Sequence, residues 1–163
     1  MDDSRKIDIR VFTLIQLRGI FVKKGLLSYR ADQVYNWIWK KGIHSFDLMT
    51  NISKESRSLL KRSFQINRIK FDISQKSVDG TIKNTVRLND NNLVEAVLIP
   101  TLNRKTACVS SQVGCSLNCE FCATSKIKNI RNLKKEEIFD QVFLMNKQSL
   151  NYYNKPLTNI VFM

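Results

Sequence analysis

The sequence predicts an α/β fold in three parts: a helical domain over residues 1–66, a small antiparallel β segment over 67–102 and a βαβ unit over 103–163. Three changes of pattern support it. Apolar residues recur at helical spacing up to about residue 66 and alternate with polar residues from about residue 69. From residue 103 a strand, a loop, a helix and a buried strand follow, an order that implies a parallel sheet.

The helical domain is expected to hold three helices, at 8–23, 28–42 and 53–64. Ser28 or Asp32 is the candidate cap at the start of the second helix, and Gly42 is its expected end. Ser53 stands where a cap of the third helix belongs. These polar and glycine positions separate the apolar runs that would form the domain's core.

Trp37 and Trp39 lie on the second expected helix. Exposed aromatic rings can serve as stacking platforms for nucleic-acid bases. Both rings, however, flank a broad apolar helix face, which favours a place in the core. The sequence therefore favours core packing for both rings over base stacking.

The β segment is expected to be a meander of strands at 69–77, 79–90 and 91–100, with turns at Asp79-Gly80 and at 90–92. The βαβ unit should begin with a strand at 106–114. Its helix is expected at 133–147, with Asn132 as the candidate cap, and its second strand at 158–163. A buried parallel strand reads as a continuous apolar run, as the last segment does.

Composition narrows the class of protein. With 27 Lys and Arg against 14 Asp and Glu, the 163-residue chain has a net charge of +13, which attracts polyanions such as nucleic acid. No apolar run is long enough to span a membrane, and the charged N-terminus lacks the apolar core of a signal peptide. We therefore expect a cytoplasmic protein, whose cysteines stay reduced and serve as metal ligands or catalysts.

Three cysteines, Cys115, Cys119 and Cys122, have the spacing C-x3-C-x2-C, and Cys108 lies seven residues upstream. Structural zinc sites usually combine two C-x2-C pairs, and the sequence has one. Small ferredoxins use C-x2-C-x2-C, which also differs. Three such close cysteines can bind three irons of a [4Fe–4S] cluster and leave the fourth iron open. A zinc site that includes Cys108, or purely structural cysteines, are the alternatives.

With Phe121 just before the last cysteine, this spacing resembles the signature of the radical-SAM superfamily. The resemblance implies a [4Fe–4S] cluster held by Cys115, Cys119 and Cys122. It also implies S-adenosylmethionine (SAM) on the open iron, with Phe121 near its adenine. In that superfamily the cluster follows the first strand of a βα barrel, so 103–163 would be the first βαβ unit of a truncated parallel radical-SAM barrel.

Longer segments narrow the resemblance: YRADQVYNWIWKKG, DGTIKNTVRLNDNNLVEAVLIP and CVSSQVGCSLNCEFCAT. Together they resemble the adenine-methylating radical-SAM RNA methyltransferases over nearly the whole chain. The resemblance implies methylation at C2 of an adenine in 23S rRNA and in certain tRNAs, through a methyl-cysteine intermediate. A sister group methylates C8 instead. An electron donor such as flavodoxin, an RNA-binding helical domain at 1–66 and a monomeric state are also expected.

The resemblance assigns roles to two further residues. Glu95 matches the carboxylate taken as proton acceptor, although an acid on an apolar strand could simply face solvent. Cys108 matches a cysteine that forms a transient disulfide with a methyl-carrying cysteine near the C-terminus. Without the resemblance, Cys108 would be regarded as a small buried hydrophobic residue.

The barrel-like part has about 60 residues, whereas a full βα barrel needs about 200 or more. The glycine-rich SAM-binding segment and the methyl-carrying cysteine of the family do not occur in the sequence. We therefore expect the chain to be the N-terminal part of a longer enzyme and to be unable to methylate RNA alone. A basic zinc-stabilised RNA-binding module is the main alternative function, and another radical-SAM activity is the second.

Overall fold

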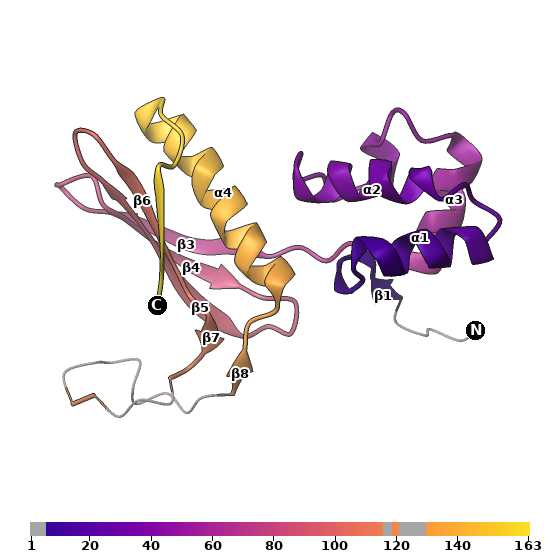
Figure 1. Cartoon of the computed structure of the whole chain (residues 1–163). Helices are drawn as coiled ribbons and strands as arrows, with labels where there is room; N and C mark the ends of the chain where they lie inside the picture. The colour runs from indigo at the N-terminus through magenta and orange to yellow at the C-terminus, as the bar shows by residue number, and fades with distance from the viewer. Residues whose placement is uncertain (1–5, 116–118, 121–129) are drawn as a thin grey trace. The chain divides into compact units, whose positions relative to one another are not determined.

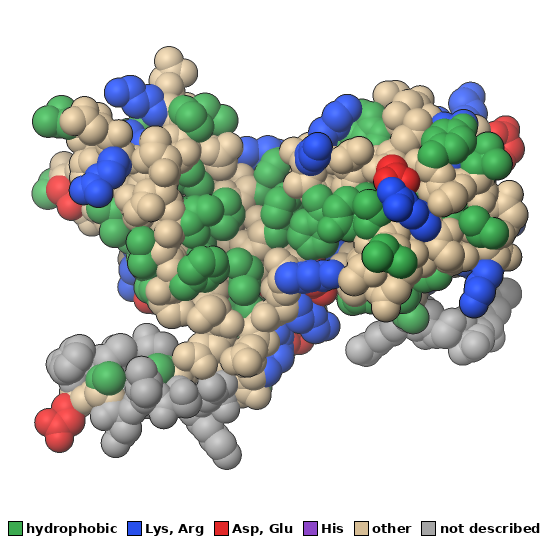
Figure 2. Space-filling view, in the orientation of Figure 1, with side chains coloured by type: hydrophobic (Ala, Val, Ile, Leu, Met, Phe, Trp, Pro, Cys, Tyr) green, Lys and Arg blue, Asp and Glu red, His purple; other side chains and the backbone are tan. Residues whose placement is uncertain are grey.

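The computed structural model describes residues 6–115, 119–120 and 130–163 (Figure 1). Contacts divide the chain into two compact units, Met1–Asn67 and Arg68–Met163, each considered by itself below. Lys and Arg side chains lie on the visible face of both units, as the net charge of +13 requires (Figure 2). No helix in the described ranges is both long and apolar enough to cross a membrane.

The first unit is a small helical domain closed by a two-residue parallel strand pair. Its elements are β1 (Ile7–Asp8), the 3₁₀ helix η1 (Ile9–Val11), α1 (Leu14–Lys23), α2 (Tyr29–Trp39), the 3₁₀ helix η2 (Phe46–Leu48), α3 (Lys54–Ser63) and β2 (Phe64–Gln65). β1 pairs with β2. The most deeply buried core side chains come from all three α helices and include Phe21, Val34 and Leu60, each with 0% exposure.

The first helix begins later than expected, at Leu14 instead of residue 8. Asp8 lies in β1, and its carboxylate accepts hydrogen bonds from the Arg10 backbone and guanidinium, an ion pair that is almost completely buried. Thr13 then caps α1: its hydroxyl accepts from the Gln16 backbone, and the Gln16 side chain accepts from the Thr13 backbone. This reciprocal cap starts the helix after the extended segment.

The ends of the other helices show which caps were correctly predicted. The expectation for α2 was wrong, because no side chain caps its start: Ser28 has helical backbone angles, and Asp32 bonds to Arg18 instead. Gly42 does end α2, with a φ of +60° that side-chain-bearing residues rarely adopt. Ser53 caps α3 by accepting from the Ser56 backbone, as predicted.

The second unit is a mixed five-stranded sheet with one long helix. Its elements are β3 (Lys70–Lys76), β4 (Ile82–Arg87), β5 (Leu93–Pro100), β6 (Lys105–Val109), β7 (Gln112–Val113), β8 (Arg131–Asn132), α4 (Lys135–Tyr153) and β9 (Asn159–Phe162). The strand order is β3-β4-β5-β6-β9. β3 to β6 are antiparallel neighbours, whereas β6 and β9 are parallel. β7 and β8 form a separate antiparallel pair.

The meander and the βαβ unit predicted from the sequence are both present, but they share one sheet because β5 also pairs with β6. The expected strand at 106–114 is divided into β6 and β7. The predicted cap Asn132 was wrong, because it lies in β8, and α4 begins after Lys134. The Glu137 carboxylate accepts a hydrogen bond of 2.8 Å from the Lys134 backbone N–H, and this bond caps the start of α4.

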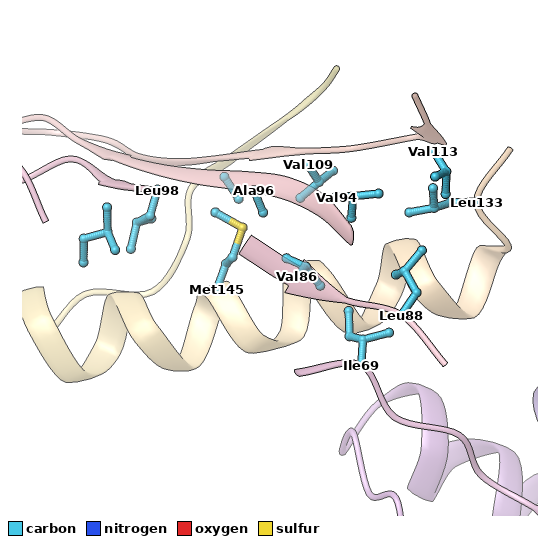
Figure 3. Close-up of a cluster of buried hydrophobic side chains, with 12 residues drawn as sticks. Ile69, Val86, Leu88, Val94, Ala96, Leu98, Val109, Val113, Leu133 and Met145 are labelled. Atoms are coloured by element: carbon cyan, nitrogen blue, oxygen red, sulfur yellow. The ribbon is translucent and has the colours of Figure 1, made fainter. Parts of the chain in front are cut away.

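The core of the second unit lies between the sheet and α4 (Figure 3). Inward side chains of three adjacent strands meet Met145 of α4; they include Val86, Ala96 and Val109, each with 0% exposure. A polar pair joins them, since the side-chain amides of Asn84 and Gln148 exchange two hydrogen bonds of 2.9 Å. In the described part of this unit, this one-sided packing leaves the other face of the sheet without a covering helix.

Candidate functional site

The two faces of the sheet in the second unit differ in chemistry. Along β5, Val94, Ala96 and Leu98 are buried toward α4, so Glu95 and Val97 point to the opposite face. Cys108 pairs in register with Val97 and therefore lies on that same face. In the described part of this unit, α4 is the helix that covers the sheet, and it covers the face away from Glu95 and Cys108 (Figure 1). The fold thus brings these two predicted site residues onto one open surface.

Cys108 lies in the centre of this surface, on β6 between β5 and β9. Its register partners are Val97 on one side and Val161 on the other. The side chain is partly buried, and this burial raises the pKa of the Cys108 thiol. At neutral pH the thiol is therefore protonated. Cys108 forms no disulfide within the described residues, and the transient disulfide expected from the resemblance has no support here.

Glu95 is a diagonal neighbour of Cys108, because β5 runs antiparallel to β6 and Val97 pairs with Cys108. Its carboxylate is about half exposed and forms an ion pair of 2.9 Å with the Lys83 ammonium of β4. The backbone carbonyl of Glu95 also accepts a hydrogen bond of 2.7 Å from the Ser110 hydroxyl. The sequence did not single out Lys83, although strand alternation places it on the same face.

The predicted cluster cysteines follow the carboxyl end of β6. Gly114 has a φ of +75°, a conformation suited to glycine, and turns the chain directly before Cys115. Cys115 and Cys119 are thiols of intermediate exposure. The third predicted ligand, Cys122, lies outside the described residues, as does Phe121. Among the residues that are described, no three His, Cys, Asp or Glu side chains gather as a metal site.

Two sets of contacts fix the chain on both sides of this cysteine segment. The buried amide of Gln141 on α4 accepts from the Ser110 backbone N–H and donates to its carbonyl, at 3.0 and 3.1 Å. The Ser111 backbone N–H and hydroxyl both donate to the carbonyl of Met163, after β9, and the Ser111 carbonyl accepts from the Leu133 backbone. The two parallel strands and α4 therefore converge on Ser110 and Ser111, just ahead of the cysteines.

On the far side of the segment, Arg131 of β8 joins two distant carboxylates. Its guanidinium donates to Glu137 of α4 at 2.8 Å through two nitrogens, and to Asp90 of the β4–β5 turn at 2.6 and 2.8 Å. Burial acts to raise the pKa of Asp90, but the hydrogen bond from Arg131 gives a net lowering. The hydrogen bond to Glu137 in turn raises the pKa of Arg131, so Arg131 and Asp90 are both charged at neutral pH.

The arrangement matches part of a radical SAM methyltransferase. A crystal structure of a radical SAM methyltransferase from Sphaerobacter thermophilus matches 96% of this chain and 47% of its own, with a TM-score of 0.80 and 30% sequence identity. A family model described as the ribosomal RNA large subunit methyltransferase N-terminal domain matches residues 7–66. The match to the solved structure extends over both units of this chain, whereas the family model covers the helical domain alone.

Sequence relatives specify the family. The probable dual-specificity RNA methyltransferase RlmN of Christiangramia forsetii is 58% identical over 160 residues, which are 98% of this chain and 46% of that protein. Its namesake in Flavobacterium johnsoniae is 56% identical over 158 residues, 97% of this chain and 45% of that protein. Over almost its whole length the chain is homologous to the N-terminal part of the RlmN dual-specificity RNA methyltransferases, and it spans slightly less than half the length of these curated relatives.

Proposed function

We propose that the chain forms the N-terminal part of a radical-SAM RNA methyltransferase that methylates C2 of an adenine in 23S rRNA and in certain tRNAs. The observation that carries this proposal is the placement of Cys108 and Glu95 on one open sheet face, beside the strand end that leads to Cys115. Homology over almost the whole chain, to relatives named as RNA methyltransferases, agrees with it.

The cluster would be held by Cys115, Cys119 and Cys122. Thiolates are the ligands that iron–sulfur clusters take, and the two cysteines that the structure describes are accessible thiols on a segment fixed at both ends. The donor set therefore fits a [4Fe–4S] cluster. When bound, the cluster and SAM would supply a 5′-deoxyadenosyl radical, with electrons from a donor such as flavodoxin. Phe121 is assigned to the SAM adenine.

Glu95 is proposed as the proton acceptor on the RNA adduct. Adenine C2 bears a hydrogen that must leave as a proton after a carbon has been added there. A half-exposed carboxylate on the open face can take this proton at Oε1 or Oε2. Lys83, 2.9 Å from Glu95 Oε1, orients the carboxylate. The pair can open at small cost, because exposed ion pairs contribute little.

Cys108 is proposed to release the product. The RNA carbon is then bonded to the sulfur of a methyl-carrying cysteine from the remainder of the enzyme. The Cys108 thiolate would attack that sulfur, so that an S–S bond forms as the S–C bond breaks, and the electron pair stays with the RNA carbon, which takes up a proton. Burial of Cys108 keeps the thiol protonated until this step and limits premature oxidation.

A chimera tests the proposal. These 163 residues would replace the matching part of the Christiangramia forsetii relative, which they resemble at 58% identity. After anaerobic incubation with SAM, a reductant and unmodified 23S rRNA, we expect 2-methyladenine in the digested RNA by mass spectrometry. The 163-residue chain alone should yield none.

Variants of the chimera separate the assigned roles. Cys119→Ala should lose the cluster and all product. Glu95→Gln and Cys108→Ala should keep the cluster but accumulate protein cross-linked to RNA. A chimera that binds the cluster yet methylates no RNA, or Glu95→Gln with unchanged product yield, would contradict the proposal.

A further inference from the structure

The first unit carries an open polar cleft at the C-terminal end of α2. Its volume is about 350 Å³, near the lower end of the range typical of small-ligand sites. One aromatic ring, two ammonium groups and three amides line it: Trp37, Lys40, Lys41, Gln33, Asn36 and Asn51. Carboxylates do not contribute to this lining, so the cleft favours an anionic ligand that also has a planar polar part.

Trp37 forms one wall of the cleft. The ring is only partly buried against the helical core, and its Nε1 donates to the Asn51 side-chain oxygen at 2.5 Å, which fixes the ring plane. The Lys41 ammonium lies 3.6 Å from the ring centroid. A cation at that distance shows that one ring face is reachable from solvent, and a nucleobase could take the same place.

Trp39, two residues further along, differs. Its ring meets that of Tyr35 at a centroid distance of 6.0 Å, one turn back on the same helix. It packs against the core from a different side of α2 and does not line the cleft. The sequence favoured core packing for both tryptophans. In the structure both rings contact the core, but only that of Trp37 also lines the cleft.

Lys40 and Lys41 supply positive charge at the cleft. Among the residues that the structure describes, neither forms an ion pair with a carboxylate, whereas Arg18 and Lys61 of the same unit do. Lysines at the end of a helix also stabilise its dipole, which is the simpler explanation for their presence. That explanation does not account for an adjoining aromatic wall or for the three amides.

The amides could read the edge of a base. The side-chain oxygen of Gln33 accepts from Arg30 at 2.8 Å, which orients this amide, and Arg30 also donates to the Asn51 backbone at 2.9 Å. Asn36 lies about one turn after Gln33 on α2, and Lys40 follows about one turn later, directly after the helix. Each amide offers donors and an acceptor that match a base edge, and such edges are accessible in unpaired RNA.

We propose that this cleft binds one unpaired nucleotide of the RNA substrate. Its base stacks on Trp37, where it displaces the Lys41 ammonium, and the flanking phosphates contact Lys40 and Lys41. The proposal rests on the proposed function only in taking RNA as the substrate. The cleft would hold the RNA at a site separate from the sheet face that carries Glu95 and Cys108.

Salt-dependent binding tests the lysines. The probe is a fluorescein-labelled RNA stem–loop with an unpaired loop, titrated with the full 163-residue chain at several KCl concentrations. For Lys40→Ala/Lys41→Ala we expect the slope of log K against log salt to fall in magnitude by about 1.4, since each phosphate contact to a single strand contributes about 0.7. The matched control Lys23→Ala/Lys54→Ala removes the same charge from exposed positions of this unit and should leave the slope unchanged.

Fluorescence tests the stacking. In a Trp39→Phe background, the stem–loop should quench the fluorescence of Trp37, and in the reciprocal Trp37→Phe background it should leave that of Trp39 unchanged. Trp37→Leu, which keeps the apolar packing, should weaken binding about 5- to 150-fold, the range expected for the loss of one base–aromatic stack. Circular dichroism confirms that each variant remains folded.

A duplex of the same sequence should not quench the fluorescence of Trp37, and Trp37→Leu should not weaken its binding. Three results would each overturn the proposal. The first is an equal slope of log K against log salt for the cleft and control lysine variants. The others are quenching confined to Trp39 and no binding of the stem–loop. Cluster content and methylation by the chimera are measured separately, so failure here would leave the proposed function standing.

Discussion

The two units use the same residue types in different ways. In the first, three helices close around a core that includes Phe21, Val34 and Leu60. In the second, one helix covers one face of a sheet, and the other face carries Glu95 and Cys108 among half-exposed apolar residues. The first unit is thus closed around its core, whereas the second leaves a carboxylate and a thiol on a sheet face that no helix of the described part covers.

If the two cores are independent, damage to one should leave the other intact. Leu60 of the first unit and Leu98 of the second each have 0% exposure and belong to separate clusters. Replacing either with Ala should lower the stability of its own unit by about 2–5 kcal/mol. Both tryptophans of the chain lie in the first unit, so urea unfolding followed by tryptophan fluorescence reports on that unit.

Leu60→Ala should therefore shift the fluorescence transition, and Leu98→Ala should shift only a transition seen by far-ultraviolet circular dichroism. Equal shifts of the fluorescence midpoint by both variants would mean that the two units unfold as one.

The charged cluster beside the cysteine segment should stabilise the second unit alone. Arg131→Met removes the two hydrogen bonds that Arg131 donates to the Glu137 carboxylate, which is 6% exposed, and should cost about 1–3 kcal/mol. Lys83→Met is the matched control, because the Lys83–Glu95 pair is half exposed and should contribute no more than about 1 kcal/mol. Circular dichroism in urea measures the stability of both variants, and similar losses would contradict a stabilising role for the contacts of Arg131 with Glu137 and Asp90.

Cys108 should react slowly with alkylating agents at neutral pH. Burial raises the pKa of its thiol, and only the thiolate is nucleophilic. The rate of modification by iodoacetamide should rise with pH through a midpoint above the usual value of about 8.5. Peptide mass spectrometry follows Cys108 alone, and the chain in urea provides the reference midpoint. A folded-state midpoint below that of the unfolded chain would show that Cys108 is activated instead.

Local features were predictable where one residue determines them. Ser53 and Gly42 act at helix ends as expected, and strand alternation put Glu95 on the face opposite the apolar residues of β5. The start of α1 could have been found from Thr13-x-x-Gln16, a capping-box pattern in the sequence.

Features that depend on distant residues were not predictable in this way. Arg131 meets Asp90 across 41 positions, and Gln141 reaches Ser110 across 31. Periodicity alone does not encode such pairs, because they follow from the shared sheet that joins β5, β6 and β9. The resemblance, in contrast, predicted roles for the cysteines without any knowledge of their surroundings, and those roles stay predictions.

Metal analysis of the purified chain tests the central claim most directly. After anaerobic reconstitution with iron and sulfide, we predict about four irons and four sulfides per chain and an electron paramagnetic resonance signal of a reduced [4Fe–4S] cluster. Cys119→Ala should abolish the signal, whereas Cys108→Ala should keep it. One zinc per chain without sulfide, retained in the presence of excess iron, would contradict the account and support a basic zinc-stabilised RNA-binding module instead.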